Sequence, residues 1–203
     1  RKEQALGKVD PGQEQVMEDQ VMFTLDMVHT ALLTLGPELI HFEVLVQQVH
    51  VGLLHAMCQA VVSHASVSII NAFSQILLCI YSFIGTISVC QLEVVLERVM
   101  LKMADGKGVL TVEQQEAALE GILDLCRQPG FVHDVFVNCD CRLERGNLFE
   151  DMCALISKTA YPLAKGSTGP QHFICQEALL AILQAIAAEN KPDAFAPPSP
   201  DLE

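Results

Sequence analysis

The residues best suited to chemistry are two cysteines one residue apart, Cys139 and Cys141, with His133 and Cys153 nearby in the sequence. Thiolates and imidazoles are the usual ligands of a structural zinc ion, but such a site spaces its cysteines about two to four residues apart, in two pairs. A single Cys-x-Cys does not meet this requirement, and the Cys-x-x-Cys spacing of a redox centre is missing. We therefore expect small buried side chains at a helix junction and no metal site.

Two glycine-rich stretches, residues 106–108 and 166–169, have the composition of phosphate-binding loops. Neither has the G-x-x-x-x-G-K-[ST] spacing and neither follows a predicted strand, so both are expected to be turns. His50 and His55 are five residues apart, which does not place them on one face of a helix. The chain also lacks G-x-S-x-G, H-E-x-x-H and spaced carboxylate pairs. We assign no catalytic residue, no cofactor and no metal, and we expect the chain not to be an enzyme.

The composition indicates a folded protein with an acidic surface. Of the 203 residues, 51% are hydrophobic and 18% are charged, which allows a sizeable core in one domain with tails. The net charge of -13 repels phosphate backbones, so we expect no nucleic-acid partner and no polybasic membrane patch. Tryptophan is absent and aromatic residues are 5% of the chain, which favours aliphatic helix packing over a β-sandwich.

The eight cysteines bear on the cellular compartment. Most of them lie inside apolar stretches, as buried free cysteines do, and the chain is too long and too aliphatic for a disulfide-stapled mini-domain. The first twenty residues are polar and acidic, unlike a signal peptide. These features predict a reducing, cytosolic environment. Because the first residue is not Met, we expect a piece of a longer protein.

No charged residue occurs between Glu43 and Glu93, and residues 67–90 within this stretch are long enough to span a bilayer. However, its polar residues recur at helical spacing and face an apolar stripe, which is typical of a buried helix in a layered protein. The flanks also lack the Lys or Arg that would orient a span. We expect no transmembrane span, and detergent-free solubility separates this hypothesis from a membrane protein. The polar set is Ser68, Asn71, Gln75, Ser82 and Thr86, and the stripe is Ile69, Ile70, Phe73, Ile76, Leu77, Ile80 and Ile84.

The remaining periodicity predicts an all-α fold. Apolar residues at steps of three or four indicate amphipathic helices joined by short turns, an arrangement that makes successive helices antiparallel. The helix pairs recur loosely at about 40–47 residues, the period of HEAT and armadillo repeats. We therefore expect an α-solenoid-like array of antiparallel helices. The predicted organisation is a polar lead-in at residues 1–14, a helical domain at residues 15–190 and a proline-rich linker at residues 191–203.

Three local predictions can be compared with the structure. Thr111 and Gln114 have the spacing of a capping box at a helix start. Asn147 is expected to cap a later helix, with Glu150 at its third position. Glu93 is expected on the solvated side of its helix, together with Glu97, Arg98 and Lys102.

From Gln91 onward the chain resembles one family. The motifs are Gln91-Leu92-Glu93, residues 114–120, residues 131–142, residues 147–150, residues 155–158 and Tyr161-Pro162. In this order they resemble the region upstream of the catalytic exchange domain in large Arf guanine-nucleotide exchange factors of the GNOM and Golgi brefeldin-A-resistance group. Its signature, the HUS box, reads Asn, an aromatic or apolar residue, Asp, Cys, then Asp or Asn. Asn138, Asp140 and Cys141 fit this pattern, whereas Cys139 and Arg142 depart from it.

The resemblance implies a non-catalytic regulatory or scaffold region of an Arf exchange factor, cytosolic and recruited peripherally to Golgi or endosomal membranes in vesicle trafficking. Exchange would be carried by a separate downstream domain. The implied partners are the N-terminal dimerisation domain of the same protein or a second copy, with small GTPases of Arf or Rab type as further candidates. The alternative is a stand-alone α-solenoid adaptor unrelated to Arf.

The residues suggest a physical role for the HUS box. Asn138 and Asp140 lie where one helix stops and another starts, so their side chains can accept hydrogen bonds from free backbone amides. We expect Cys141 to point inward. This structural role and direct partner contact by Asn138, Cys139, Asp140, Cys141 and Arg142 are both open, and they coincide if a rigid bend presents a defined surface.

Overall fold

A computed structural model of the chain describes residues 11–106, 110–161 and 168–189. Throughout these ranges the secondary structure is helical and contains no strand, so the predicted all-α class is confirmed. The chain divides into two compact units, Arg1–Ser88 and Val89–Glu203. Of the predicted polar lead-in at residues 1–14, residues 1–10 lie outside the described residues, as does the linker at residues 191–203, and the first helix begins at Pro11.

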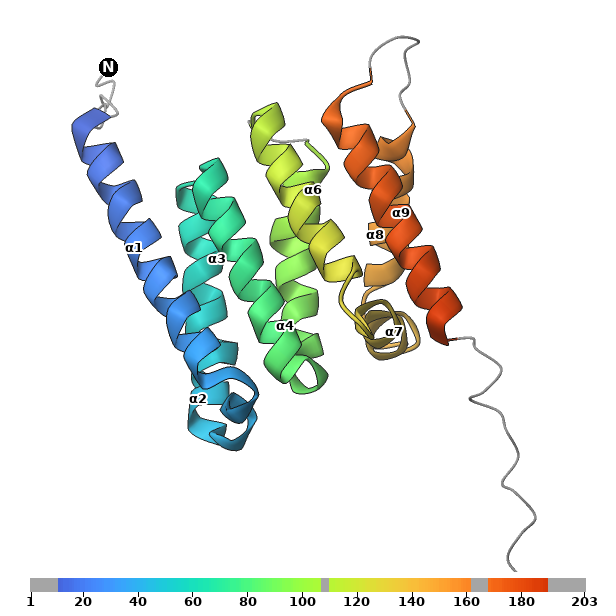
Figure 1. The fold of residues 1–203 in the computed structure, drawn as a ribbon, viewed down its shortest axis with the longest axis horizontal. Helices are drawn as coiled ribbons and strands as arrows, with labels where there is room; N and C mark the ends of the chain where they lie inside the picture. The colour runs from blue at the N-terminus through green and yellow to red at the C-terminus, as the bar shows by residue number, and fades with distance from the viewer. Residues whose placement is uncertain (1–10, 107–109, 162–167, 190–203) are drawn as a thin grey trace, which may run out of the picture. The chain divides into compact units, whose positions relative to one another are not determined.

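The first unit is a stack of antiparallel helices (Figure 1). Helix α1 (Pro11–Leu35) ends at Gly36, whose positive φ of 54° turns the chain into the short 3-10 helix η1 (Gly36–His41). The chain then returns through α2 (Glu43–Gln48), one π turn η2 (Val49–Leu53) and α3 (Leu54–Ser63). Apolar side chains fill the space between α1 and this returning arm, with Leu25, Leu32, Val46, Leu54 and Met57 buried.

Helix α4 (Val67–Val95) is interrupted at Ile84, where φ of -134° and ψ of 22° leave the helical region. The next residue, Gly85, permits the chain to turn closely over Tyr81, because a Cβ atom built on it would lie 2.6 Å from the Tyr81 ring. The uncharged helix therefore ends where the sequence predicted, near Gly85. Across the break, Ser88 is fully buried and its Oγ lies 2.7 Å from His50 Nε2 of η2.

The apolar stripe of α4 is part of the protein core. Its polar side is exposed at Ser68, Asn71, Gln75 and Ser82, as predicted, while the side chain of Thr86 lies outside the description. By length and composition, three helical stretches of the described chain could cross a membrane: Glu43–Ser63, Val67–Gly85 and Pro170–Glu189. Half of the most apolar of these windows, in Val67–Gly85, is buried inside the protein. The stripe residues Ile69, Ile70, Phe73, Ile76, Leu77 and Ile80 are fully buried and Ile84 is nearly so.

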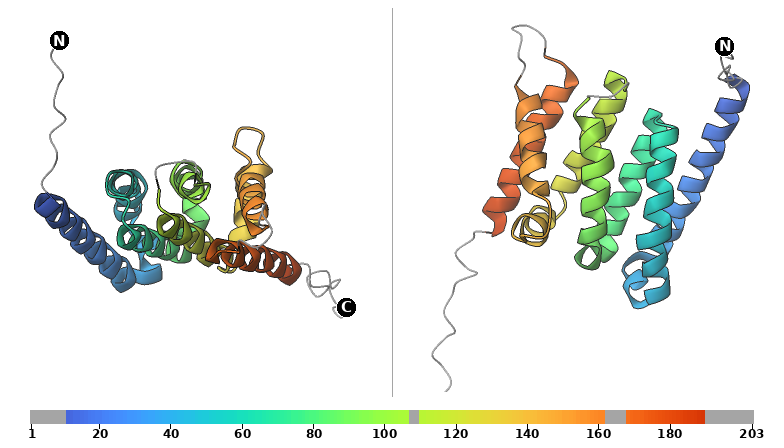
Figure 2. Two further views of the ribbon diagram at one scale, coloured as in Figure 1. Left: turned by 90° about the horizontal axis from the view of Figure 1, so that it is seen from above. Right: turned by 180° about the vertical axis from the view of Figure 1, so that it is seen from behind.

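The second unit begins with the end of α4, which continues through the π turn η3 (Leu96–Met100) into α5 (Leu101–Ala104). Next come α6 (Val112–Cys126), α7 (Phe131–Val135), a third π turn η4 (Phe136–Asp140), α8 (Leu148–Ala160) and α9 (Pro170–Glu189). Figure 2 shows α6 and α9 side by side, with α8 against α9 in the other layer. Arg127 at the end of α6 pairs with Glu177 of α9, and Lys158 of α8 reaches Asp105 at 3.1 Å.

The predicted capping box at the start of α6 is confirmed. The backbone N–H of Thr111 donates to Gln114 Oε1 at 2.7 Å, and the backbone N–H of Gln114 donates to Thr111 Oγ1 at 3.3 Å. Helix α6 therefore has a defined start directly after the glycine-rich turn, of which residues 107–109 lie outside the description.

Candidate functional site

The chain bends between η4 and α8, and the HUS-box residues lie at this bend. The carboxylate of Asp140 accepts two backbone hydrogen bonds from the first turn of α8, one from the N–H of Phe149 at 2.9 Å and one from the N–H of Glu150 at 3.0 Å. A negative charge at the positive end of a helix makes such hydrogen bonds strong. Asp140 thereby performs the predicted capping role and fixes the start of α8 relative to η4.

Asn147 occupies the residue before α8 but does not cap it, so the prediction for Asn147 is wrong. The carboxylate of Asp140, seven residues earlier, already occupies the amides that a local cap would use. The side-chain amide of Asn147 instead donates to Glu150 Oε2 at 3.0 Å.

Asn138 also differs from expectation, because its side chain stabilises η4 and not a following helix. Its Nδ2 donates to the carbonyl oxygen of Asp134 at 2.8 Å, and its Oδ1 accepts from Arg142 Nη2 at 3.4 Å. The backbone N–H of Cys141 donates to the carbonyl of Phe136 at 3.0 Å, which closes the π turn. Single π turns inside helices are frequent at functional sites.

The two cysteines of the box lie on opposite sides of the backbone. Cys139 is buried, and burial together with the charges of Glu93 and Asp140 raises the pKa of its thiol to about 12. Cys141 is exposed, so the expectation that it points inward is wrong. The reason is helical register: Cys139 follows the buried Val135 by four residues, and Cys141, two residues further on, faces the other way. In the part of the chain that the structure describes, no three His, Cys, Asp or Glu side chains are grouped to hold a metal.

A buried carboxylate, Glu93, ties the loop after the HUS box to α4. Glu93 is only 6% exposed, although it was predicted on the solvated side of its helix. It accepts from Arg145 Nη1 at 2.7 Å and from the backbone N–H of Gly146 at 3.1 Å. The other Arg145 nitrogen, Nη2, lies 2.9 Å from the sulfur of Cys90. A signal was present in the sequence, because Glu93 is three residues before Leu96 and four after Val89 on the apolar face.

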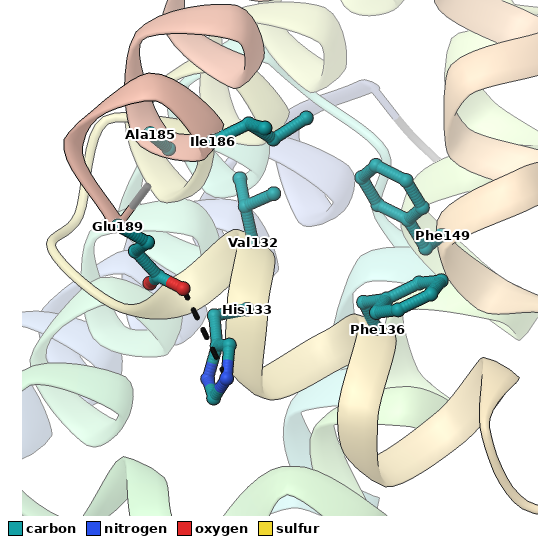
Figure 3. Close-up of a pocket in the computed structure, with 7 residues that line it drawn as sticks. All are labelled: Val132, His133, Phe136, Phe149, Ala185, Ile186 and Glu189. Atoms are coloured by element: carbon teal, nitrogen blue, oxygen red, sulfur yellow. Dashed lines mark ion pairs between the residues drawn. The ribbon is translucent and has the colours of Figure 1, made fainter. Parts of the chain in front are cut away.

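An open groove adjoins the bend on the side of α9 (Figure 3). Its volume is about 370 Å³. Phe136 of η4 and Phe149 of α8 meet edge to face at one end, with ring centroids 5.8 Å apart and an interplanar angle of 76°. At the other end His133 Nε2 lies 3.9 Å from Glu189 Oε2. The groove is lined by Val132, His133, Phe136, Phe149, Ala185, Ile186 and Glu189.

The described residues thus form an all-α domain whose bend is capped by Asp140 and tied to α4 by Glu93. Comparison with known proteins shows its family. The chain belongs to the Mon2/Sec7/BIG1-like HUS domain family, whose model matches residues 2–148. The predicted resemblance is thereby confirmed, which argues against an adaptor unrelated to Arf.

The similar curated proteins are large exchange factors. The chain is 31% identical over 170 residues to the ARF guanine-nucleotide exchange factor GNL1 and 28% identical over 170 residues to GNOM, both from Arabidopsis thaliana. Each match covers 84% of this chain and 12% of the relative, so the chain spans about an eighth of their length. A Golgi-specific brefeldin A-resistance guanine nucleotide exchange factor 1 homolog of Caenorhabditis elegans is 38% identical over 74 residues, 36% of this chain and 4% of that protein. No solved structure matches the chain significantly.

Proposed function

We propose that this chain is a non-catalytic regulatory domain of an Arf guanine-nucleotide exchange factor acting in Golgi or endosomal vesicle trafficking. The observation that carries the proposal is the capped bend at Asp140, in a chain that belongs to the HUS domain family. In this proposal the exchange reaction is performed elsewhere in the parent protein, and this domain supplies contacts. It remains on the cytoplasmic side of the membrane and has no transmembrane span of its own.

The contact surface that we propose is made of Val137, Cys141, Arg142 and Leu143, here called the bend surface. Leu143 is fully exposed, Val137 is 41% exposed, and Cys141 and Arg142 are exposed beside them. The hydrogen bonds of Asp140 and Asn138 hold the backbone on either side of this surface. Because the supporting backbone is fixed, a partner binds without first having to order it.

The partner that we propose is the N-terminal dimerisation domain of the same protein, either within one chain or from a second copy. Small GTPases of Arf or Rab type are the second candidates, and the relatives named as ARF exchange factors support them. A net charge of -13 disfavours nucleic acid. Membrane association is peripheral and occurs through the parent protein.

A binding measurement between this 203-residue chain and the parent's N-terminal domain tests the proposal. Burying a leucine contributes about 1.5–3 kcal/mol, so Leu143→Asp is expected to weaken binding by about tenfold or more. The matched control is Leu183→Asp, because Leu183 is 63% exposed and belongs to α9, which contributes no residue to the bend surface. A folded chain that shows no binding, or equal binding by both variants and the wild type, contradicts the proposal.

A further inference from the structure

The groove beside the bend is an apolar surface without an occupant among the described residues. Phe136 of η4 is 47% exposed and Ile186 of α9 is 42% exposed, and both line the groove (Figure 3). Its walls come from η4, α8 and α9, which pack against one another in the second unit. Exposed apolar grooves of this kind mark binding sites when a suitable occupant is within reach.

Among the residues outside the described ranges, residues 190–203 are the closest in sequence to the groove. Helix α9 ends at Glu189, and Glu189 itself lines the groove. Phe195 is six residues further on, and an extended chain covers at most about 3.3–3.6 Å per residue, so it reaches roughly 20 Å. This reach exceeds the size of the groove. Phe195 is therefore able to return to it.

The composition of this segment fits the groove. Phe195 is its only aromatic residue and lies between Ala194 and Ala196, whose side chains are small. The aromatic side chain of Phe195 thus matches the mostly apolar lining of the groove.

We propose that the groove is an intramolecular docking site for Phe195. This inference is independent of the proposed function, because groove and occupant belong to the same chain. A short tether gives an effective concentration in the millimolar range, so even a contact with a dissociation constant of about 1 mM is substantially populated. Docking places the segment that leaves α9 beside the bend surface, where it can compete with or complete a partner contact.

The test uses the 203-residue chain with the substitution Phe195→Trp, because the natural sequence contains no tryptophan. The introduced indole is then the sole reporter. Docking is expected to shift its emission to shorter wavelength and to slow its quenching by acrylamide, relative to a peptide of residues 190–203 carrying the same substitution. In this background Phe136→Ala and Ile186→Ser are expected to abolish both effects.

The matched control is Phe173→Ala, which removes a 62% exposed phenylalanine of α9 that does not line the groove. It is expected to leave the emission shift and the slow quenching intact. The two groove variants lie on different elements, so the test still has a result if one of them fails to fold. Thermal melts identify a variant that does not fold. Equal quenching in chain and peptide, or a shift that the groove variants leave unchanged, overturns the proposal. A shift that disappears on dilution overturns it too, because it indicates contact between copies.

Discussion

At the scale of single residues, Asp140 is the centre of the bend. Its carboxylate accepts hydrogen bonds from two backbone amides in the first turn of α8, which have no partner within the helix. The exposed residues of the bend surface therefore depend on a group that does not belong to that surface. We expect substitutions at Asp140 to lower the stability of the fold, and substitutions at Leu143 to lower the affinity for the partner.

We predict that Asp140→Ala lowers the free energy of unfolding by about 1–2 kcal/mol, because the helix N-cap is lost. Asp140→Asn is expected to recover part of the loss, since an amide oxygen still accepts one hydrogen bond. Urea denaturation measures both. Asn147→Ala is the control and is expected to change stability by less than about 0.5 kcal/mol, because Asn147 does not cap α8. A larger effect at Asn147 than at Asp140 contradicts the assignment.

We predict that removing the Glu93 carboxylate lowers the free energy of unfolding more than removing an exposed carboxylate does. Glu93→Ala leaves Arg145 and the Gly146 N–H without their acceptor, and the loss of a hydrogen bond to a charged group costs about 1.5–3 kcal/mol. Glu97→Ala, one turn further along the same helical arm at an exposed position, is the matched control. Similar unfolding midpoints for the two variants would show that Glu93 is not an anchor.

At the scale of elements, the break in α4 depends on a glycine. Gly85→Ala places a methyl group against the ring of Tyr81, which is 8% exposed and has little room to move. We predict a loss of about 1–3 kcal/mol in the free energy of unfolding, as for other overpacked core sites. Gly12→Ala in α1, where nothing lies within 4 Å of the new atom, is expected to cause no loss. Equal stabilities of the two variants would argue against the close approach.

The contact between η2 and α4 is predicted to be sensitive to pH. Burial lowers the pKa of His50 from the usual 6.5, so the folded state prefers the neutral imidazole that lies against Ser88. The contribution of His50 to stability is therefore fully present above pH 6.5 and is lost as the pH falls below that value. His50→Gln is expected to flatten this decline in urea denaturation at several pH values, whereas His41→Gln, at an exposed position, leaves it in place. An unchanged slope in His50→Gln would contradict the prediction.

Most of the elements could be predicted from the sequence because helical periodicity is a local signal. The apolar stripe of α4, the break near Gly85 and the capping box of Thr111 all depend on residues within a few positions of one another. The details of the bend depend on longer distances. Glu93 meets Arg145 across 52 residues, and the π turn η4 has no sequence signature that we recognised. Local reasoning therefore found the capping role of Asp140 but misplaced Cys141, Asn147 and Glu93.

At the scale of the whole molecule, the described helices bury apolar stripes against one another within each unit, and the acidic surface gives a net charge of -13. Since half of the most apolar window is already buried in the protein, we predict that the 203-residue chain is soluble without detergent. Sedimentation after expression measures this. Recovery only in detergent micelles would instead indicate that one of the three apolar helices inserts in a membrane.

Partner binding by the bend surface is tested most directly by hydrogen–deuterium exchange of this chain, measured with and without the parent's N-terminal domain. We predict slower exchange of the amides at residues 136–143 when that domain is present, and no such slowing in the Leu143→Asp variant. Unchanged exchange at residues 136–143 under saturating amounts of the domain would contradict the claim that the bend surface binds a partner.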